Sequence, residues 1–162
     1  MRCFSLALVL AACASSSTPS SNSPSTPPAS TAAASGFDAA RAQRLGADEY
    51  GMKQYVIAFL YAGPNRPTDP EESKTLMRGH LDNIHRLAES GKLVLAGPMG
   101  DDGELRGIYV FDVKTVAEAE ELTRTDPAIQ RGSLRMELHP WYGSAGLGDV
   151  NAIHRSIAKT PI

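Results

Sequence analysis

Cysteine is nearly absent from this chain. Its 162 residues include only Cys3 and Cys13, both close to the N-terminus. If Cys3 is removed with a leader and Cys13 is modified, no thiol remains to form a disulfide in the rest of the chain. The fold must then be stabilised by its apolar core alone, and chemistry that depends on a cysteine thiol is excluded.

Long apolar runs and an excess of positive charge are also missing. The apolar run at residues 4–12 is far shorter than the roughly 18 residues that span a bilayer, so we expect no permanent transmembrane helix. The formal net charge is −2, and the loss of Arg2 with a leader would make it more negative. Because basic residues form no stripe, we expect no nucleic-acid partner.

The N-terminus has the form of a secretory signal. One basic residue and a short apolar run precede the quartet Leu10-Ala11-Ala12-Cys13, which resembles the lipobox of bacterial lipoproteins. The resemblance implies a signal peptide at 1–12, acylation of Cys13 and a lipid anchor as the only membrane attachment. It also implies a periplasm-facing place in the cell envelope, at the outer membrane in a Gram-negative cell because Ala14 follows the cysteine. The alternative is an ordinary signal peptide that releases a soluble protein.

The next segment reads as a tether. Residues 14–36 carry no charge and no large apolar side chain, so they cannot bury enough surface to offset the entropy of ordering. Residues 37–52 add Phe37, Leu45 and Tyr50 and form either a short helix or no regular structure. We therefore assign residues 13–52 to the lipidated cysteine and a disordered tether, residues 53–142 to one folded domain, and residues 143–162 to a C-terminal extension.

Six elements are predicted within the domain. Asp69-Pro70 marks a helix start and Gly91 its end, Asp102-Gly103 a turn, and Thr115 with Glu118 a capping box. These signals and the apolar patterns predict strands at about 53–61, 92–98, 106–113 and 133–143, with helices at about 70–90 and 115–125.

The order βαββαβ is that of the ferredoxin-like α+β fold, with a four-stranded antiparallel sheet and both helices on one face. The first strand, MKQYVIAFLYAG, is apolar on both faces, so the open face of the sheet needs a cover. A second copy of the chain is the simplest one, and we expect a homodimer whose sheets face each other.

One histidine lies on the apolar face of the first predicted helix. At ~100° per residue, His80 falls near the middle of an arc of roughly 140° that contains Leu76, Met77, Leu81, Ile84, Leu87 and Ala88. A histidine at such a position is either a hydrogen-bonded core residue or a working group in a pocket.

The segments GHLDNIHRLAESGKLVLAGP, GELRGIYVFDV, TDPA and HPW, in this order, resemble the YCII-related family. The resemblance implies a dimeric α+β barrel and a His/Asp pair in a cavity, which falls on His80 and Asp126. One relative dehydrochlorinates a hydroxylated aromatic ring, whereas most members have no established reaction. The N-terminal signal, the C-terminal extension and the short hairpin after the second strand depart from the family.

The pair carries the functional hypothesis. An unperturbed imidazole changes its charge near neutral pH, and a carboxylate from Asp126 would orient the ring of His80. Asp126 precedes a proline, as Asp69 does, so helix capping is the alternative role. We take Ser73, Arg78 and Arg135 as candidate substrate-binding residues, the two arginines as cations at the pocket edge for an anionic substrate.

No metal site or cofactor is expected. His85 is ~140° from His80 around the helix, and no carboxylate or thiol joins His139 and His154 at ligand spacing. Two functions fit the sequence. The first is a cofactor-independent lyase or isomerase-like enzyme in which His80 moves a proton on a small molecule. The second is a non-catalytic domain that binds a small ligand or an envelope partner.

Overall fold

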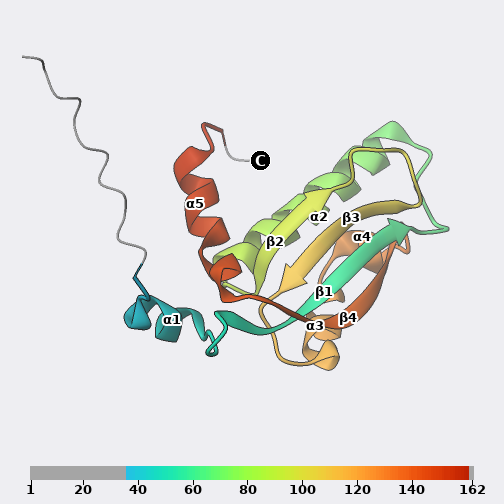
Figure 1. The fold of residues 1–162 in the computed structure, drawn as a ribbon. Coiled ribbons are helices and arrows are strands. Elements are labelled where there is room, and N and C mark those ends of the chain that lie inside the picture. The colour runs from blue at the N-terminus through green and yellow to red at the C-terminus, as the bar shows by residue number, and fades with distance from the viewer. Residues whose placement is uncertain (1–35, 161–162) are drawn as a thin grey trace, which may run out of the picture. The chain divides into compact units, whose positions relative to one another are not determined.

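The computed structural model describes residues 36–160 (Figure 1). The predicted signal peptide and the predicted lipidation residue Cys13 lie outside the described residues. Within the described range, none of the helices combines the length and the apolar character needed to cross a membrane.

Four strands form one antiparallel sheet. They are β1 (Met52–Ala62), β2 (Leu93–Pro98), β3 (Leu105–Phe111) and β4 (Leu134–Ser144), in the order β2-β3-β1-β4. This order, with helices between β1 and β2 and between β3 and β4, is that of the ferredoxin-like α+β fold (Figure 1). The predicted fold class is confirmed.

The two predicted helices begin at the residues that local chemistry predicts. The Asp69 side chain accepts the Glu71 N–H at 2.8 Å, ahead of α2 (Pro70–Glu89). Gly91 then takes a left-handed φ of 72°, which glycine adopts without strain. Thr115 and Glu118 form the predicted capping box ahead of α3 (Val116–Thr123).

A third, short helix was not predicted. Residues 126–130, which the sequence placed in a connection, contain α4 (Pro127–Gln130) with Asp126 as its N-cap. Its Asp-Pro start repeats that of α2, but only four residues follow, too few to show an apolar period.

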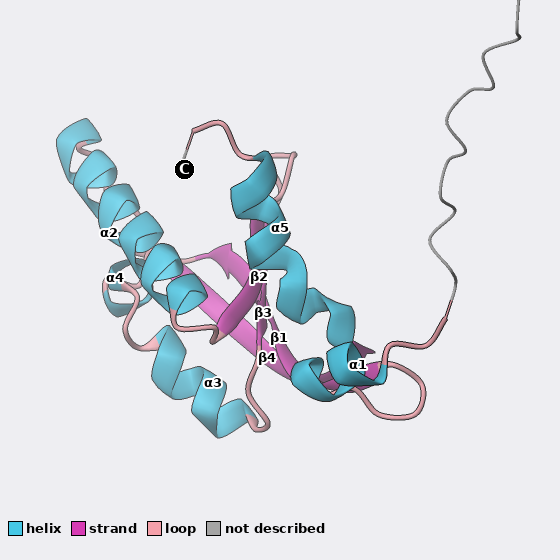
Figure 2. Cartoon of the chain, turned by 90° about the vertical axis from the view of Figure 1, so that its left-hand side faces the viewer, coloured by secondary structure: helices cyan, strands magenta, loops and turns pink. Residues whose placement is uncertain are grey.

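The main core lies between one face of the sheet and the helices α2 and α3, as Figure 2 shows. Alternate residues of β1 point into it: Val56 and Ala58 are fully buried there and Leu60 nearly so. Leu87 supplies the contact from α2 and Ala119 the contact from α3. This packing fixes the α2 face that carries His80.

The segments on either side of the predicted domain are folded. Residues 39–45 form α1 (Ala39–Leu45), and η1 (Ala145–Asp149) and α5 (Val150–Ile157) follow β4. Arg41 of α1 pairs with Asp149 at 2.7 Å. Regular structure is therefore present before residue 53, and residues 145–157 of the expected extension are helical.

These additions lie on the side of the sheet away from α2 and α3 (Figure 2). Leu147 of η1 packs against a second apolar cluster formed by Tyr55, Val94 and Val110. Part of the face expected to need a second copy is thus covered by the same chain. Towards the β1–β4 side, Ile57, Phe59 and Trp141 remain only partly buried.

Candidate active site

His80 and Asp126, 46 residues apart in sequence, meet in the structure. The Nδ1 atom of His80 lies 2.7 Å from Oδ2 of Asp126. The Asp126 side chain is fully buried, and that of His80 is 12% exposed. The imidazole therefore faces inward from α2, and its partner is the carboxylate that the family resemblance indicated.

Asp126 is held by α4 as well as by His80. Its Oδ1 atom accepts the N–H of Ala128 at 2.8 Å, and its backbone carbonyl accepts those of Ile129 and Gln130. Capping and histidine binding are thus simultaneous, because each uses a different carboxylate oxygen. The two roles that the sequence left as alternatives are compatible.

Tyr109 of β3 contacts the other ring nitrogen. Its hydroxyl lies 3.3 Å from Nε2 of His80, and the two rings are inclined by only 20°. Burial, followed by the negative charge of Asp126, raises the pKa of Tyr109 well above its ordinary value of 10.0. Tyr109 therefore stays protonated and can donate to Nε2, while the ionised Asp126 accepts from Nδ1–H. This assignment makes the neutral ring an Nδ1–H tautomer.

The close approach of α2 to α4 depends on Gly79. A Cβ atom at this position would lie 3.2 Å from Cγ of Pro127, tighter than an ordinary van der Waals contact. The residue before His80 and the residue after Asp126 therefore touch. Glycine at 79 allows the helices to come near enough for the 2.7 Å contact.

A buried amide stabilises the same junction one turn further along α2. Asn83, 6% exposed, accepts through Oδ1 from Arg86 at 2.6 Å and from the Thr125 hydroxyl at 2.8 Å. Thr125 directly precedes Asp126, so this contact ties the carboxylate's own segment to α2. The buried face of α2 therefore differs from the predicted apolar arc. Asn83, which the arc did not include, is buried, whereas Met77, which it did include, is 56% exposed.

A small cavity of about 110 Å³ opens beside His80. Since a water molecule takes about 30 Å³ of liquid volume, the cavity holds three or four waters or the edge of a small compound. Its remaining lining is mainly apolar, with Ser73, Ser133 and Arg66 as the other polar side chains.

Of the three expected substrate-binding residues, only Ser73 lines the cavity beside His80. Its hydroxyl donates to the carbonyl of Pro67 at 3.3 Å. Arg78 is exposed and is not part of the lining. Arg135 is exposed too, paired with Glu137 at 3.2 Å and stacked over Tyr61. Neither arginine lines the cavity beside His80, because each lies on an outward-facing position of its element.

Three polar residues at the site were missed. Tyr109 lies on a strand that reads as plain core, Arg66 lies in a connection, and Ser133 precedes β4. Arg66 is the cation of the cavity lining within the described residues. Ser133 is 7% exposed, and no partner of its hydroxyl is found in the described part of the chain. None carries a local motif, so only their spatial convergence identifies them.

Among residues 36–160, no group of three or more His, Cys, Asp or Glu side chains is placed to hold a metal ion.

Residues 55–142 match the YCII-related domain. The chain belongs to the YCII-related family. It is 30% identical over 63 residues to the uncharacterized protein YjpA of Bacillus subtilis (strain 168), an alignment that covers 39% of this chain and 72% of that protein.

A solved structure also resembles this chain. It is the 5-chloro-2-hydroxyhydroquinone dehydrochlorinase (TftG) of Burkholderia phenoliruptrix AC1100 in complex with 2,5-dihydroxybenzoquinone. The match has a TM-score of 0.41 and 16% identity, and covers 55% of this chain and 93% of the other.

Proposed function

We propose that this YCII-related domain is a cofactor-independent enzyme that transfers a proton on a small anionic compound. The observation that carries the proposal is the pairing of His80 with a fully buried carboxylate at 2.7 Å beside a cavity. A histidine oriented in this way is a typical general acid or base at neutral pH.

His80 and Asp126 carry the mechanism. Asp126 holds Nδ1–H and leaves Nε2 as the acceptor, so Nε2 removes a proton from an acidic C–H or O–H group of the substrate. The charge formed on the imidazolium is stabilised by Asp126. The proton then returns to another atom in an isomerisation, or stays on His80 while a leaving group departs with its electron pair.

The cavity lining indicates the substrate class. Arg66 supplies a positive charge that suits a carboxylate or phenolate, and Ser73 and Ser133 supply hydroxyl groups. Leu76 and Leu134 provide the apolar walls. A compact anion with one apolar edge fits this combination.

Binding without catalysis is the alternative. It is favoured by the contact of Tyr109 with Nε2, because this hydroxyl occupies the atom that would act as the base. At 3.3 Å the contact is longer than the usual 2.7–2.8 Å for a hydroxyl donor. A substrate proton can therefore displace it at little cost.

Deuterium exchange tests the enzymatic proposal without knowledge of the natural substrate. Small 2-oxo acids and hydroxylated benzoates are incubated with the protein in D₂O, and loss of their exchangeable C–H signals is followed by ¹H NMR. We expect exchange of at least one compound that His80→Gln abolishes. His85→Gln, a change of an exposed histidine on the same helix, is the matched control and should exchange as the unmodified protein does.

Asp126→Asn separates orientation from capping. The asparagine carbonyl can still accept from Ala128, but its N–H₂ group would face Nδ1 and favour the Nε2–H tautomer. The exchange rate should fall about 10²- to 10⁴-fold, and ¹⁵N shifts of the ring should report the tautomer change. If the His80 ring keeps its tautomer in Asp126→Asn, or if no compound tested exchanges in a His80-dependent way, the enzymatic proposal is wrong and ligand binding is the function.

We further propose that the domain works as a homodimer and is anchored to the envelope through Cys13. The first proposal is supported by the partly buried Ile57, Phe59 and Trp141 on the open sheet face. The second rests on the lipobox-like quartet alone, and mass spectrometry of the mature N-terminus tests it. An unmodified cysteine in protein purified from membranes would contradict it.

A further inference from the structure

A second and larger cavity lies away from His80. Its volume is about 380 Å³, and it is built between the end of α2, the start of β2 and the elements α1, η1 and α5. Those three last elements fall outside residues 55–142, the part that matches the family. The cavity is thus formed where this chain adds structure to the domain.

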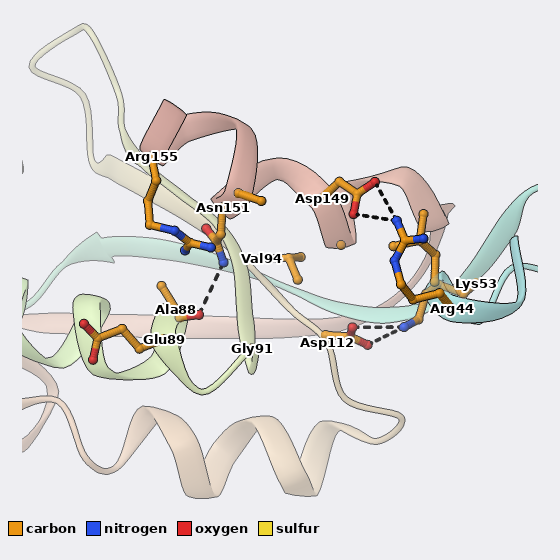
Figure 3. A pocket seen from close by; sticks show the side chains of 13 residues that line it. Arg44, Lys53, Ala88, Glu89, Gly91, Val94, Asp112, Asp149, Asn151 and Arg155 are labelled. Atoms are coloured by element: carbon orange, nitrogen blue, oxygen red, sulfur yellow. Dashed lines mark hydrogen bonds and ion pairs between the residues drawn. The ribbon is translucent and has the colours of Figure 1, made fainter. Parts of the chain in front are cut away.

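The added elements are clamped in place by polar contacts. Asn151 of α5 donates to the carbonyl of Leu93 at 2.8 Å and reaches that of Ala88 at 3.5 Å, which Figure 3 shows in part. Asp149 accepts from Arg41 at 2.7 Å and lies 3.4 Å from Arg44. These contacts hold α1, η1 and α5 in place, so a ligand would not have to order the backbone of the cavity walls.

The charges around the cavity fall into paired and unpaired groups. Lys53 is neutralised by Asp112 at 2.7 Å, and Arg44 lies near Asp149. The other two charged residues of the lining, Glu89 and Arg155, form no ion pair within the part of the chain that the structure describes. One charge of each sign remains available to a ligand.

The two unpaired charges come from different walls. Arg155 projects from α5 toward the end of α2, which carries Ala88 and Glu89 (Figure 3). Glu89 is the last residue of α2, where the carbonyl end of the helix already carries a partial negative charge. A carboxylate at this position is unfavourable unless a cation approaches it, so the α2 wall favours a positive group.

We propose that this cavity binds a small aliphatic zwitterion, an α-amino acid or a short peptide. Its ammonium group lies at Glu89 and the end of α2, and its carboxylate at Arg155, where a guanidinium can form two parallel hydrogen bonds. Val94, Ala88 and Leu45 provide an apolar wall for an aliphatic side chain. The volume holds about a dozen waters at ~30 Å³ each, enough for either ligand.

Isothermal titration calorimetry with L-leucine and glycyl-L-leucine tests the proposal on the unmodified protein. N-acetyl-L-leucine lacks the cation and L-leucinamide lacks the anion, so each should bind at least about tenfold more weakly than L-leucine. Binding of the dipeptide alone would select the peptide over the free amino acid. Failure of both zwitterions to bind, or equal binding of the blocked analogues, would overturn the proposal.

Two substitutions locate the site. Arg155→Gln and Glu89→Gln should each weaken L-leucine binding about tenfold or more. Arg124→Gln and Glu104→Gln make the same charge changes outside the cavity lining and should leave the affinity unchanged. If the cavity variants bind as the controls do, the zwitterion lies elsewhere and the assignment is wrong. The experiment is independent of His80, so it stands or falls separately from the proton-transfer proposal.

Discussion

Gly79 and Pro127, the neighbours of the His80–Asp126 dyad, are in close contact. A Cβ atom added at Gly79 would lie 3.2 Å from Cγ of Pro127. His80 follows the glycine and Asp126 precedes the proline. Backbone packing between α2 and α4 therefore determines the distance between Nδ1 and Oδ2. The site depends on how closely two helices approach, and this dependence can be tested.

Gly79→Ala should loosen the dyad without unfolding the protein. Alanine gains up to about 1 kcal/mol of helix propensity, which offsets much of the cost of moving Pro127 by a few tenths of an ångström. We expect a free energy of unfolding within about 1 kcal/mol of the original, but several-fold slower deuterium exchange. Gly97→Ala, where a Cβ meets no atom within 4 Å, is the control. Equal exchange rates in the two variants would mean that the helix spacing does not govern the dyad.

A comparison of Asp126 with Asp69 measures how much the histidine contact contributes to the free energy of unfolding. Both precede a proline and cap a helix, but only Asp126 also contacts an imidazole. Asp69→Ala should cost about 1 kcal/mol, the usual value of an N-cap. Asp126→Ala should cost about 2–4 kcal/mol, because it also leaves the partly buried Nδ1 group without a partner. Urea denaturation at neutral pH measures both values, and equal losses would show that capping is the only structural role of Asp126.

The free energy of unfolding at alkaline pH should depend on the ionisation of the buried tyrosines. Burial, with a smaller contribution from Asp112, raises the pKa of Tyr55 to about 12, and the pKa of Tyr109 is raised in the same direction. In the unfolded chain both ionise near pH 10, so above that pH the unfolded state binds fewer protons. The stabilisation is complete below pH 10 and is lost as the pH rises toward the folded pKa values.

Tyr109→Phe isolates one of these two tyrosines. Between pH 9 and pH 11, we expect the free energy of unfolding to decline less steeply in this variant than in the unmodified protein. Urea denaturation at several pH values measures this decline. The exposed Tyr50→Phe is the control and should reproduce the original slope. An unchanged slope in Tyr109→Phe would indicate that the Tyr109 hydroxyl is accessible to water.

The proposed dimer is tested on the open face of the sheet. Phe59→Glu places a charge among partly buried apolar residues of β1 and should shift sedimentation from dimer to monomer. Tyr50→Glu, at a side chain that is 78% exposed, should sediment as the original protein does. A dimer that survives Phe59→Glu would place the interface elsewhere, and a monomeric original protein would end the proposal.

The sequence by itself determined the elements whose boundaries depend on neighbouring residues. These signals act within one helical turn, so they can be recognised from neighbouring residues alone. They are Asp69-Pro70, Gly91 and the capping box of Thr115 and Glu118. The ferredoxin-like topology followed from the order of these elements. The inward orientation of His80 also followed, because the 3.6-residue period places it on the apolar face.

Tertiary structure decided which groups converge on that histidine. Tyr109 and Arg66 carry no local signal, since their neighbours in space come from distant strands and connections, and Arg78 and Arg135 looked equally suitable as cations. No local pattern predicted that η1 and α5 pack onto the sheet or that α1 packs onto η1, because these contacts join residues that are far apart in the chain. Local chemistry sets helix and strand ends, but the identity of a site depends on long-range packing.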